Sequence, residues 1–565
     1  MKREESVWQK YHEENGGWKE YPENSMFAFM KETAQKYPDF TAIEFEGKKT
    51  TYKKLIEQIE ETAVSLKACG VGKGDYITIV SPNTPQALIG VYAANRIGAV
   101  ANILHPLLSV NEIQKFIEDV DSKAIITLDM IYPKFVKMQW KQGMNPKIIL
   151  SRVADALPTY KKYVYLATNK VRLTINPQHD VIYWNDFITF GRKSGVLLPA
   201  DSGKADDLAV ILYSGGTTGV PKGVMVTNSN LNCLAVQSHD VYERDDIPGA
   251  HSLALMPVFH GFGLGVCMHG MLCNALHVFL VAKYDMNACT KLIFKRKISF
   301  LFGVPALYEA ISRSEEIEEK DLSFIKFIVT AGDKTSLPLM EKFNRQLEKG
   351  GSKAKMREAY GQTECTSGCC INPFFDIRNG SIGIPYADTL MKIVAVGTEE
   401  EMPTGESGEI CICGPAVMKG YLNSPEETEK VLRVHKDGRT WLHTGDIGYV
   451  DEDGYYYFGQ RYSRMIITAG YNVYPSMVEN AINSYRGVRT CCVVGVDSPI
   501  VGQKIRAYIV LNNPEADENE AKKEIIECCR RNVAEYSIPH EFVFRKELPV
   551  SSLGKIDFKK LTEEG

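Results

Sequence analysis

Short apolar runs and segments with helical periodicity alternate over the first 150 residues of the chain. The run 42–47 (AIEFEG) precedes a helical segment at 52–70, and the run 76–82 (YITIVSP) precedes another at 87–100. Strands that alternate with helices predict an α/β layered domain. A glycine or proline after each apolar run supplies the loops that such units need.

The alternation pauses between residues 151 and 207 and then resumes. The segment 151–207 is polar and rich in lysine, so we expect it to lie on the surface as an excursion rather than in the core. Four apolar runs beyond it are candidate strands: 208–213 (LAVILY), 252–257 (SLALMP), 299–305 (SFLFGVP) and 327–332 (FIVTAG).

After about residue 405 the pattern changes to short strands and turns, as in 408–415 (GEICICGP) and 448–459 (GYVDEDGYYYFG). This pattern of short strands and turns predicts a small β-rich subdomain. The last hundred residues carry their own strands and a helix, enough for a separate small α+β domain. Because 565 residues exceed a single core, we predict an N-terminal α/β domain at 1–463 and a C-terminal α+β domain at 464–565.

The composition is that of a soluble globular protein, with 44% hydrophobic and 24% charged residues and a net charge of −4. Charges of both signs are interspersed and no basic face stands out, which argues against nucleic acid as a partner. The stretch 252–282 is mostly apolar, but a proline, three histidines and several glycines interrupt it. We therefore expect a buried strand and helix there, with no transmembrane segment.

The N-terminus is charged and lacks the apolar stretch of a secretory signal. We therefore expect a cytoplasmic protein with reduced thiols. The fourteen cysteines show no paired CxxC spacing. We expect most of them to be small buried hydrophobic residues, in preference to a zinc site.

A glycine-rich segment, 213–224 (YSGGTTGVPKGV), directly follows the apolar run that begins at residue 208. It supplies glycines, hydroxyl groups and one positive charge: Ser214, Gly215, Gly216, Thr217, Thr218, Gly219 and Lys222. Glycines let the backbone approach a polyanion, so amides, hydroxyls and the ammonium predict a phosphate cradle. The GxxxxGK[ST] spacing of the common P-loop is absent, and a plain surface turn would need neither the threonines nor the lysine.

This segment resembles the phosphate loop of the acyl-adenylate-forming superfamily, which includes acyl-CoA synthetases, peptide-synthetase adenylation domains and firefly-type luciferases. The resemblance extends from about residue 25 to the C-terminus. It implies a large N-terminal domain, with two α/β layered sheets and a small β-subdomain, that binds ATP and a carboxylic acid. It also implies a small mobile C-terminal domain that rotates between an adenylating and a thioester-forming pose.

The string YGQTE at 360–364 matches a second hallmark of that superfamily. The resemblance implies that Tyr360 packs on adenine, that Thr363 lies close to a phosphate and that Glu364 helps to hold Mg²⁺. A hard cation prefers carboxylate oxygens and spreads the charge of the phosphates. Alone, such a short string would be typical of a capped surface turn.

Three further residues have implied roles in the same superfamily. Asp446 in TGD would accept hydrogen bonds from the ribose hydroxyls, and Arg461 would donate to them or to a phosphate. The stretch 549–560 (PVSSLGKIDFKK) resembles the terminal motif, which makes Lys555 the catalytic lysine. Its ammonium would contact the carboxylate and the α-phosphate during adenylation, where negative charge must be held.

His260 in MPVFHGFGL matches the aromatic-histidine segment that borders the acyl site in the superfamily. Peptide-synthetase domains carry an aspartate there, so His260 argues against an α-amino-acid substrate. The chain departs from the family at the hinge, where Ser463 and Arg464 replace a lysine and an acid. Rotation needs a residue that absorbs a dihedral change rather than a particular charge. Asp333 replaces a small residue beside adenine, and its contact with the base stays open.

The expected reaction has two halves. An acid and ATP give acyl-AMP and pyrophosphate, and a thiol, expected to be coenzyme A, then displaces AMP. Gly361 stands where acetate-type members carry tryptophan, which favours a medium- or long-chain fatty acid, with an aromatic acid next.

Other functions stay open at this point. They are an acyl-AMP ligase that loads a carrier protein, a luciferase-like oxygenase and a non-catalytic adenylate-binding protein. GFGLG lacks the GxGxxG spacing of a dinucleotide site. The sequence leaves the oligomeric state open, with a homodimer among the alternatives.

Overall fold

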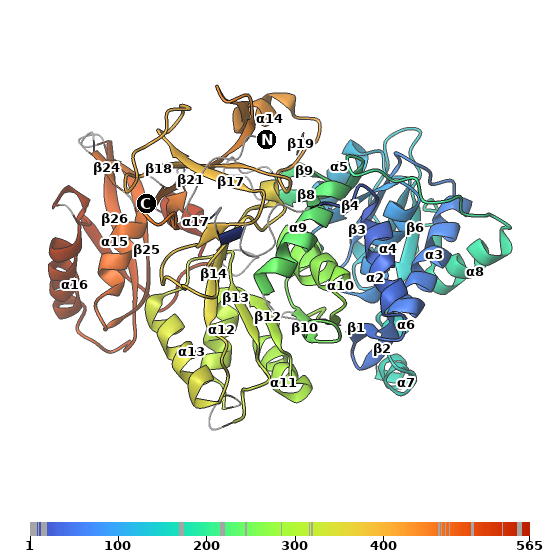
Figure 1. Cartoon of the computed structure of the whole chain (residues 1–565), viewed down its shortest axis with the longest axis horizontal. Helices are drawn as coiled ribbons and strands as arrows, with labels where there is room; N and C mark the ends of the chain where they lie inside the picture. The colour runs from blue at the N-terminus through green and yellow to red at the C-terminus, as the bar shows by residue number, and fades with distance from the viewer. Residues whose placement is uncertain are drawn as a thin grey trace. The chain divides into compact units, whose positions relative to one another are not determined.

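The chain divides into two compact units, one formed by residues 1–390 with 412–433 and the other by residues 391–411 with 434–565 (Figure 1). The computed structural model describes residues 8, 11–12, 20–168, 175–214, 221–242, 246–283, 285–315, 317, 320–461, 464, 466–468, 471–473, 475–498, 502–533, 535–550 and 556–564. The predicted boundary between residues 463 and 464 falls inside the second unit and stays a prediction.

The first unit contains an eight-stranded sheet built mainly from parallel strands. Its strands, in spatial order, are β19 (Gly420–Tyr421), β9 (Lys222–Thr227), β8 (Leu208–Ser214), β4 (Val100–Leu104), β3 (Tyr76–Val80), β5 (Ala124–Leu128), β6 (Lys147–Ser151) and β7 (Val181–Tyr183). The six strands from β8 to β7 in this spatial order run parallel to one another. By contrast, β9 is antiparallel to β8, and β19 is antiparallel to β9. β4 and β5 are buried along their whole length, as expected for parallel strands covered on both faces.

Three helices around this sheet begin at a serine or threonine whose side chain caps the helix N-terminus. The side chains of Thr51, Thr84 and Ser109 accept hydrogen bonds from first-turn backbone N–H groups, which otherwise lack a partner within the helix. The helices that these residues cap are α3 (Tyr52–Ala68), α4 (Pro85–Arg96) and α5 (Val110–Asp119).

A second, nine-stranded sheet completes the first unit. Its strands, in spatial order, are β16 (Ile384–Pro385), β15 (Cys370–Ile371), β14 (Met356–Tyr360), β13 (Phe327–Thr330), β12 (Phe300–Gly303), β10 (His251–Ala254), β11 (His277–Leu280), β1 (Thr41–Phe45) and β2 (Lys48–Thr51). The strands from β14 to β1 run parallel. Helices α11 (Met286–Arg296), α12 (Pro305–Arg313) and α13 (Leu337–Lys349) alternate with them along the chain. The four apolar runs predicted as strands are β8, β10, β12 and β13.

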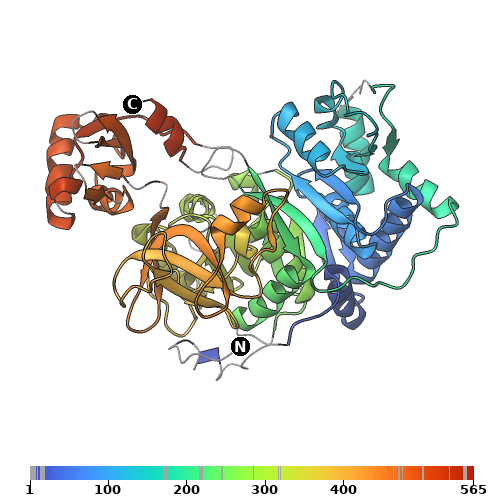
Figure 2. The same cartoon turned by 90° about the horizontal axis from the view of Figure 1, so that it is seen from above.

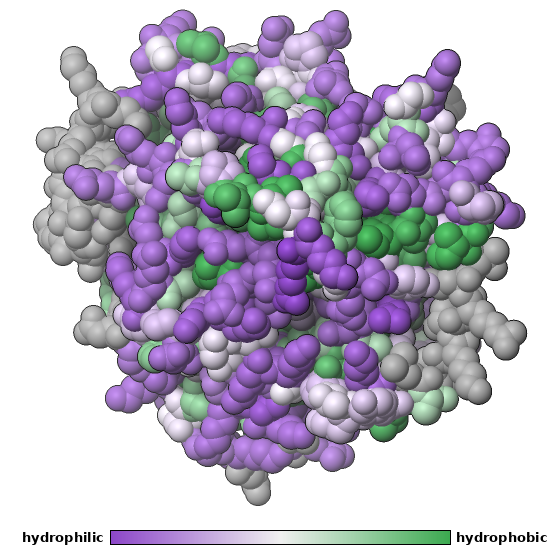
Figure 3. All heavy atoms as spheres, turned by 90° about the vertical axis from the view of Figure 1, so that its right-hand side faces the viewer, coloured by the Kyte–Doolittle hydropathy of each residue, from purple (hydrophilic) through white to green (hydrophobic). Residues whose placement is uncertain are grey.

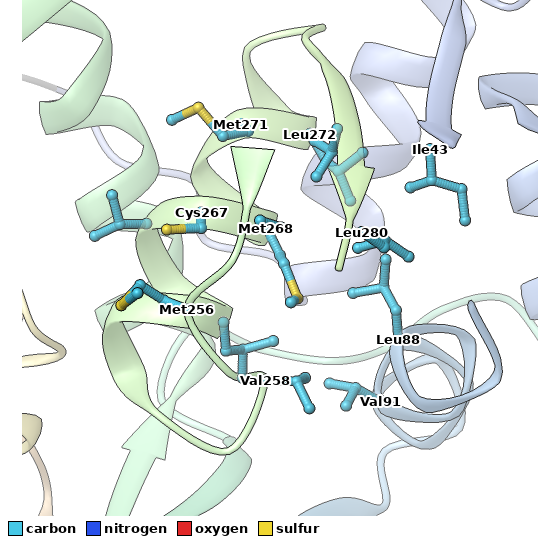
Figure 4. Close-up of a cluster of buried hydrophobic side chains, with 14 of the residues drawn as sticks. Ile43, Leu88, Val91, Met256, Val258, Cys267, Met268, Met271, Leu272 and Leu280 are labelled. Atoms are coloured by element: carbon cyan, nitrogen blue, oxygen red, sulfur yellow. The ribbon is translucent and has the colours of Figure 1, made fainter. Parts of the chain in front are cut away.

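Four helical elements pack against one another within the core that the two sheets share. They are α2 (Met26–Lys36), α9 (Asn228–Tyr242), the π-helix η2 (Phe262–Gly270) and α10 (Met271–Cys273). Figure 4 shows Val258 and Met268 facing Leu88 and Val91 of α4. The apolar stretch 252–282 is therefore buried strand and helix, as predicted. No helix in the described part of the chain is long and apolar enough to cross a membrane.

The prediction that 151–207 is only a surface excursion was wrong for part of that region. Its strand β7 extends the eight-stranded sheet, and α8 (Trp184–Lys193) buries Trp184 and Phe187. A Cβ on Gly191 would lie 2.0 Å from Oγ of Ser65, so α8 packs tightly on α3. Figure 3 shows one face of the molecule, on which hydrophilic residues predominate around smaller hydrophobic patches.

A small β-sheet begins near residue 390 and lies mostly within the second unit, which confirms the predicted β-rich subdomain. Its strands are β17 (Leu390–Val394), β18 (Gly408–Cys413), β21 (Thr440–Val450) and β20 (Leu432–Val434), with β22 (Tyr456–Arg461) paired to β21.

A second sheet with its own core follows toward the C-terminus of this unit (Figure 2). Its strands are β24 (Tyr471–Val473), β23 (Ile466–Thr468), β26 (Gly502–Leu511) and β25 (Val488–Ser498), with β27 (Glu541–Phe544) beside β26. The helices α15 (Pro475–Asn483) and α16 (Glu518–Asn532) pack in the core on one face, and α17 (Phe558–Glu563) packs in the other. This region is therefore α+β, as predicted.

Asn83 joins the loop after β3 to the segment after β10, and so connects the two large sheets. Its amide donates to the carbonyls of Ala254 and Met256, both at 3.0 Å, and its carbonyl accepts from the N–H of Val258 at 2.7 Å. The side chain is buried. These bonds fix the segment that leads to His260.

We expect Asn83→Ala to lower the free energy of unfolding by about 3 kcal/mol, because three buried hydrogen bonds are lost. Urea denaturation would measure the change. Asn185→Ala is the control, because Asn185 is exposed and makes one 3.3 Å bond to Asp155. Equal stability of the two variants would contradict the role given to Asn83.

Candidate active site

The glycine-rich segment connects two antiparallel strands of the eight-stranded sheet. β8 ends at Ser214, β9 begins at Lys222, and these two residues lie opposite each other in the register. Strand pairing therefore brings the two ends of the predicted phosphate cradle together. Residues 215–220 lie outside the described residues, and they include Gly215, Gly216, Thr217, Thr218 and Gly219.

An acid and an aromatic ring hold the Lys222 side chain. Its ammonium lies 2.5 Å from a carboxylate oxygen of Glu427, on α14 (Pro425–Val431), and 5.0 Å from the centre of the Tyr421 ring. Hydrogen bonds from Lys222 and from Lys430 lower the pKa of the Glu427 carboxyl to about 2. The sequence did not single out Glu427 or Tyr421.

The same tyrosine also holds the predicted metal ligand. The Tyr421 hydroxyl donates a hydrogen bond of 2.9 Å to Oε1 of Glu364. Strand β19 places Tyr421 there, because it pairs with β9 in register with Val224. The ring of Tyr421 thus contacts Lys222 while its hydroxyl holds Glu364, and the two sequence motifs meet at one side chain.

Tyr360, Thr363 and Glu364 lie at the end of β14 and in the short helix η3 (Thr363–Cys365) that follows it. Tyr360 is buried, whereas Thr363 and Glu364 are half-buried. A Cβ on Gly361 would lie 2.5 Å from the backbone carbonyl of Ser367. Glycine is therefore required at this position by close backbone packing.

Glu364 fits the group that the superfamily implies, a magnesium ion. The Tyr421 hydroxyl occupies Oε1, and no described residue donates a hydrogen bond to Oε2. An ionised carboxylate oxygen that is held in place is the kind of ligand that Mg²⁺ prefers. Glu364 is therefore the residue that would hold the ion.

His260 lies between β10 and η2 and is half-buried. Its backbone carbonyl accepts from the N–H of Leu264 at 2.9 Å, at the start of the π-helix. A Cβ on Gly263 would lie 1.9 Å from the carbonyl oxygen of Pro257, so the glycines of GFGLG permit this tight turn. Short π-helical turns are rare and occur frequently at functional sites.

An apolar cavity begins beside these residues, within the first unit. It is narrow, with about 20 Å³ of space that can hold the centre of a water-sized sphere. Its lining runs from Phe262, two residues after His260, to Ala359, next to Tyr360. Other large side chains in the lining are Tyr242, Phe302, Phe327 and Tyr386. None of its lining residues carries a formal charge. The lining therefore suits an apolar group, and it must move apart to admit an acyl chain.

Asp446 and Arg461 come together in the small β-sheet of the second unit. They lie opposite each other in the β21–β22 register, and Asp446 is buried. The Arg461 side chain, Ser463 and Lys555 lie outside the described residues. Arg464 pairs with Glu479 at 2.5 Å.

A buried chain of hydrogen bonds supports the turn that carries Asp446. The N–H of Gly445 donates to Oε1 of Glu409 at 3.0 Å, and Nδ1 of His443 lies 2.9 Å from Oε2. Nε2 of His435 lies 2.9 Å from Nε2 of His443. Glu409 and His443, with Cys411, offer ligand atoms within 4.8 Å of one another. Both oxygens of Glu409 are already bonded within the chain, which favours a structural role over metal binding.

The fourteen cysteines are free thiols and ten of them are buried, as predicted for small hydrophobic residues. Asp333 is exposed and accepts a bond from the N–H of Lys334 at 2.8 Å. Whether Asp333 contacts adenine stays open.

Comparison with known families identifies the family of this chain. The model of the AMP-binding enzyme family matches residues 30–422, and that of the AMP-binding enzyme C-terminal domain matches residues 477–555. The chain belongs to the AMP-binding enzyme family. This confirms the resemblance to the acyl-adenylate-forming superfamily and the predicted fold class.

Two curated relatives cover nearly the whole of this AMP-binding enzyme. A long-chain-fatty-acid–CoA ligase of Bacillus subtilis (strain 168) is 33% identical over 554 residues, which are 96% of this chain and 95% of that protein. A feruloyl-CoA synthase of Amycolatopsis sp. is 30% identical and covers 93% of this chain and 95% of its own length.

Among solved structures, an anthranilate CoA ligase in complex with anthranoyl-AMP has a TM-score of 0.81 at 21% identity. The match covers 96% of this chain and 97% of that one. At this level of identity the match supports the fold.

We expect Tyr421→Phe to lower kcat about tenfold, because a hydrogen bond to a charged group is lost while the ring under Lys222 remains. The Mg²⁺ concentration for half-maximal activity should rise as Glu364 loses its support. Magnesium titrations of pyrophosphate release would measure both effects. Tyr449→Phe is the control, since that ring stacks on Tyr457 in the other unit. Wild-type magnesium dependence in Tyr421→Phe would refute the role of this hydroxyl.

Proposed function

We propose that this AMP-binding enzyme is an ATP-dependent acyl-CoA synthetase that acts on fatty acids, with aromatic acids as the next class. It joins a carboxylic acid to ATP, releases pyrophosphate and transfers the acyl group to coenzyme A. Two relatives with this type of activity in their names, a fatty-acid ligase and a feruloyl-CoA synthase, support the class. The uncharged lining of the narrow cavity, which includes Phe262 and Ala359, supports an apolar acid.

The contact that carries this proposal is the one that Tyr421 makes with both Lys222 and Glu364. A cation and a carboxylate on one tyrosine offer partners for a phosphate and for its magnesium ion. The acyl cavity begins at Ala359, adjacent to Tyr360 in the chain. A carboxylate at the mouth of that cavity would lie close to the nucleotide.

We assign the site residues as follows, carrying the roles from the superfamily onto matching positions. The phosphates are held by Ser214, Gly215, Gly216, Thr217, Thr218, Gly219, Lys222 and Thr363. Tyr360 packs on adenine, Asp446 and Arg461 bind the ribose, and Glu364 holds Mg²⁺. His260 borders the acyl group, and Lys555 contacts the reacting carboxylate and α-phosphate.

In the first half-reaction, a carboxylate oxygen attacks the α-phosphorus and the bond to pyrophosphate breaks. Bound Mg²⁺ would spread the charge of the leaving pyrophosphate. Lys222 exchanges its partner Glu427 for a phosphate, and Lys555 holds charge on the attacking and attacked groups without transferring a proton. In the second half-reaction, the thiol sulfur attacks the acyl carbon and AMP leaves.

The thiol acceptor and the compartment belong to the same proposal. The CoA ligases among the relatives favour coenzyme A over a carrier protein. The fourteen free thiols support a cytoplasmic location for the protein, because thiols stay reduced in that compartment.

ATP–pyrophosphate exchange with a panel of acids tests the proposal. We expect the fastest exchange with decanoate and palmitate, slower exchange with cinnamate, and little with acetate or phenylalanine. Lys555→Ala should lose exchange but still convert supplied acyl-AMP and coenzyme A to acyl-CoA. Fastest exchange with acetate or phenylalanine would contradict the acid class. Equal loss of both half-reactions in folded Lys555→Ala would contradict the role of the lysine.

A further inference from the structure

The segment at residues 20–26, which we call the N-terminal strap, is bound along the helix α9. Groups of the strap form hydrogen bonds of 3.0 to 3.3 Å with three amide side chains of that helix, Asn228, Asn232 and Gln237. The partner of Gln237 is the hydroxyl of Tyr21. Ser238, the next residue of α9, lines the acyl cavity. The strap is therefore fixed directly behind one wall of that cavity.

The strap also holds the segment 386–389, which contributes another wall. The Tyr21 hydroxyl donates a hydrogen bond of 2.6 Å to Oδ2 of Asp388. Gln237 is buried and donates to the backbone carbonyl that precedes Asp388 at 2.5 Å. Tyr386, two residues before Asp388, lines the acyl cavity. Tyr21 and Gln237 therefore join two parts of the cavity wall, α9 and the segment 386–389.

The backbone at Asp388 needs this support. Its φ of 59° lies in the left-handed region, which aspartate tolerates better than most residues but which still costs free energy. Burial and the Asp388 carboxylate raise the pKa of Tyr21, so the phenol keeps its proton and remains a donor. A hydrogen bond to a carboxylate is stronger than one between neutral groups. The bond from Tyr21 therefore opposes relaxation of the turn.

The walls of the cavity differ in how firmly they are held. Phe302, Phe327 and Ala359 stand on β12, β13 and β14, which have a hydrogen-bonded strand on each side. Tyr386 follows β16, which is the end strand of the same sheet and is two residues long. Segments with few backbone hydrogen bonds open locally at the lowest cost. Because the lining must move apart to admit an acyl chain, we expect the segment 386–389 to be the wall that moves.

We propose that the hydrogen bond between Tyr21 and Asp388 is a latch on the acyl cavity and that it selects acids by size. This inference rests on the proposed function, which assigns the cavity to the acyl group. A long acid needs the segment 386–389 displaced, so its apparent affinity falls in proportion to the fraction of molecules that are open. A short acid needs less displacement and is affected less. Tyr21 and Asp388 are therefore specificity-determining residues behind the cavity lining.

Tyr21→Phe in the full chain tests the latch, because it removes the hydroxyl and keeps the ring. In pyrophosphate exchange, we expect kcat/KM for palmitate to rise about fivefold relative to octanoate, since the loss of a bond to a charged group favours the open state. Asp388→Asn should raise the ratio less, because asparagine tolerates the left-handed conformation and still accepts from Tyr21. Tyr457→Phe is the control and should leave the ratio unchanged, since that hydroxyl donates to Asp451 at 3.1 Å in the other unit.

Binding of cis-parinaric acid, a fluorescent long-chain fatty acid, measures the opening without catalysis. We expect Tyr21→Phe to bind this probe about fivefold more tightly than the wild type does, and Tyr457→Phe to bind it like the wild type. If the wild type binds the probe but exchanges none of the acids, the proposed function is contradicted, while tighter binding by Tyr21→Phe still supports the latch. The latch is overturned if Tyr21→Phe keeps the wild-type ratio or probe affinity, if exchange with both acids changes equally, or if no form of the chain binds the probe.

Discussion

The site depends on the two contacts of Tyr421, an aromatic ring near the Lys222 ammonium and a hydroxyl that holds Glu364. A tyrosine can serve both groups because its ring face attracts cations while its hydroxyl donates to an acid. Lys222 begins β9 of the eight-stranded sheet, whereas Glu364, far away in sequence, lies in η3 just after β14 of the nine-stranded sheet. Strand β19, which is only two residues long, brings the tyrosine to them by pairing with β9.

The nine-stranded sheet connects this nucleotide site to the acyl cavity. β14 carries Tyr360 at its end, and its penultimate residue, Ala359, lines the cavity. On the opposite side, the π-helix follows His260 and contributes Phe262. Asn83 fixes the segment before His260 from the other sheet. The chemistry at the phosphates and the choice of acid therefore depend on the same packed core.

Much of the fold follows from patterns in the sequence. Buried parallel strands read as apolar runs, which is why β8, β10, β12 and β13 could be predicted. The α8 region could not, because Trp184 and Phe187 stand in a short apolar segment between polar stretches and become core only when α8 meets α3. The pattern of apolar residues within a segment does not reveal its contact with a helix that is distant in sequence.

The residues of the site likewise fall into those that the sequence could predict and those that it could not. Ser214, Lys222, Tyr360, Thr363 and Glu364 lie in motifs with characteristic spacing. Tyr421 and Glu427 have no such signal, because their role depends on the register between β19 and β9. Glu409 and His443 likewise act across neighbouring strands, where each supports the turn at Gly445 directly or through the other.

A crystal structure with Mg²⁺ and a non-hydrolysable ATP analogue would test the central claim most directly. The account predicts a metal ion on Oε2 of Glu364 while the Tyr421 hydroxyl still holds Oε1. It also predicts that Lys222 has left Glu427 to contact a phosphate. A triphosphate bound away from Lys222 and Glu364, with the Lys222–Glu427 pair intact, would contradict it.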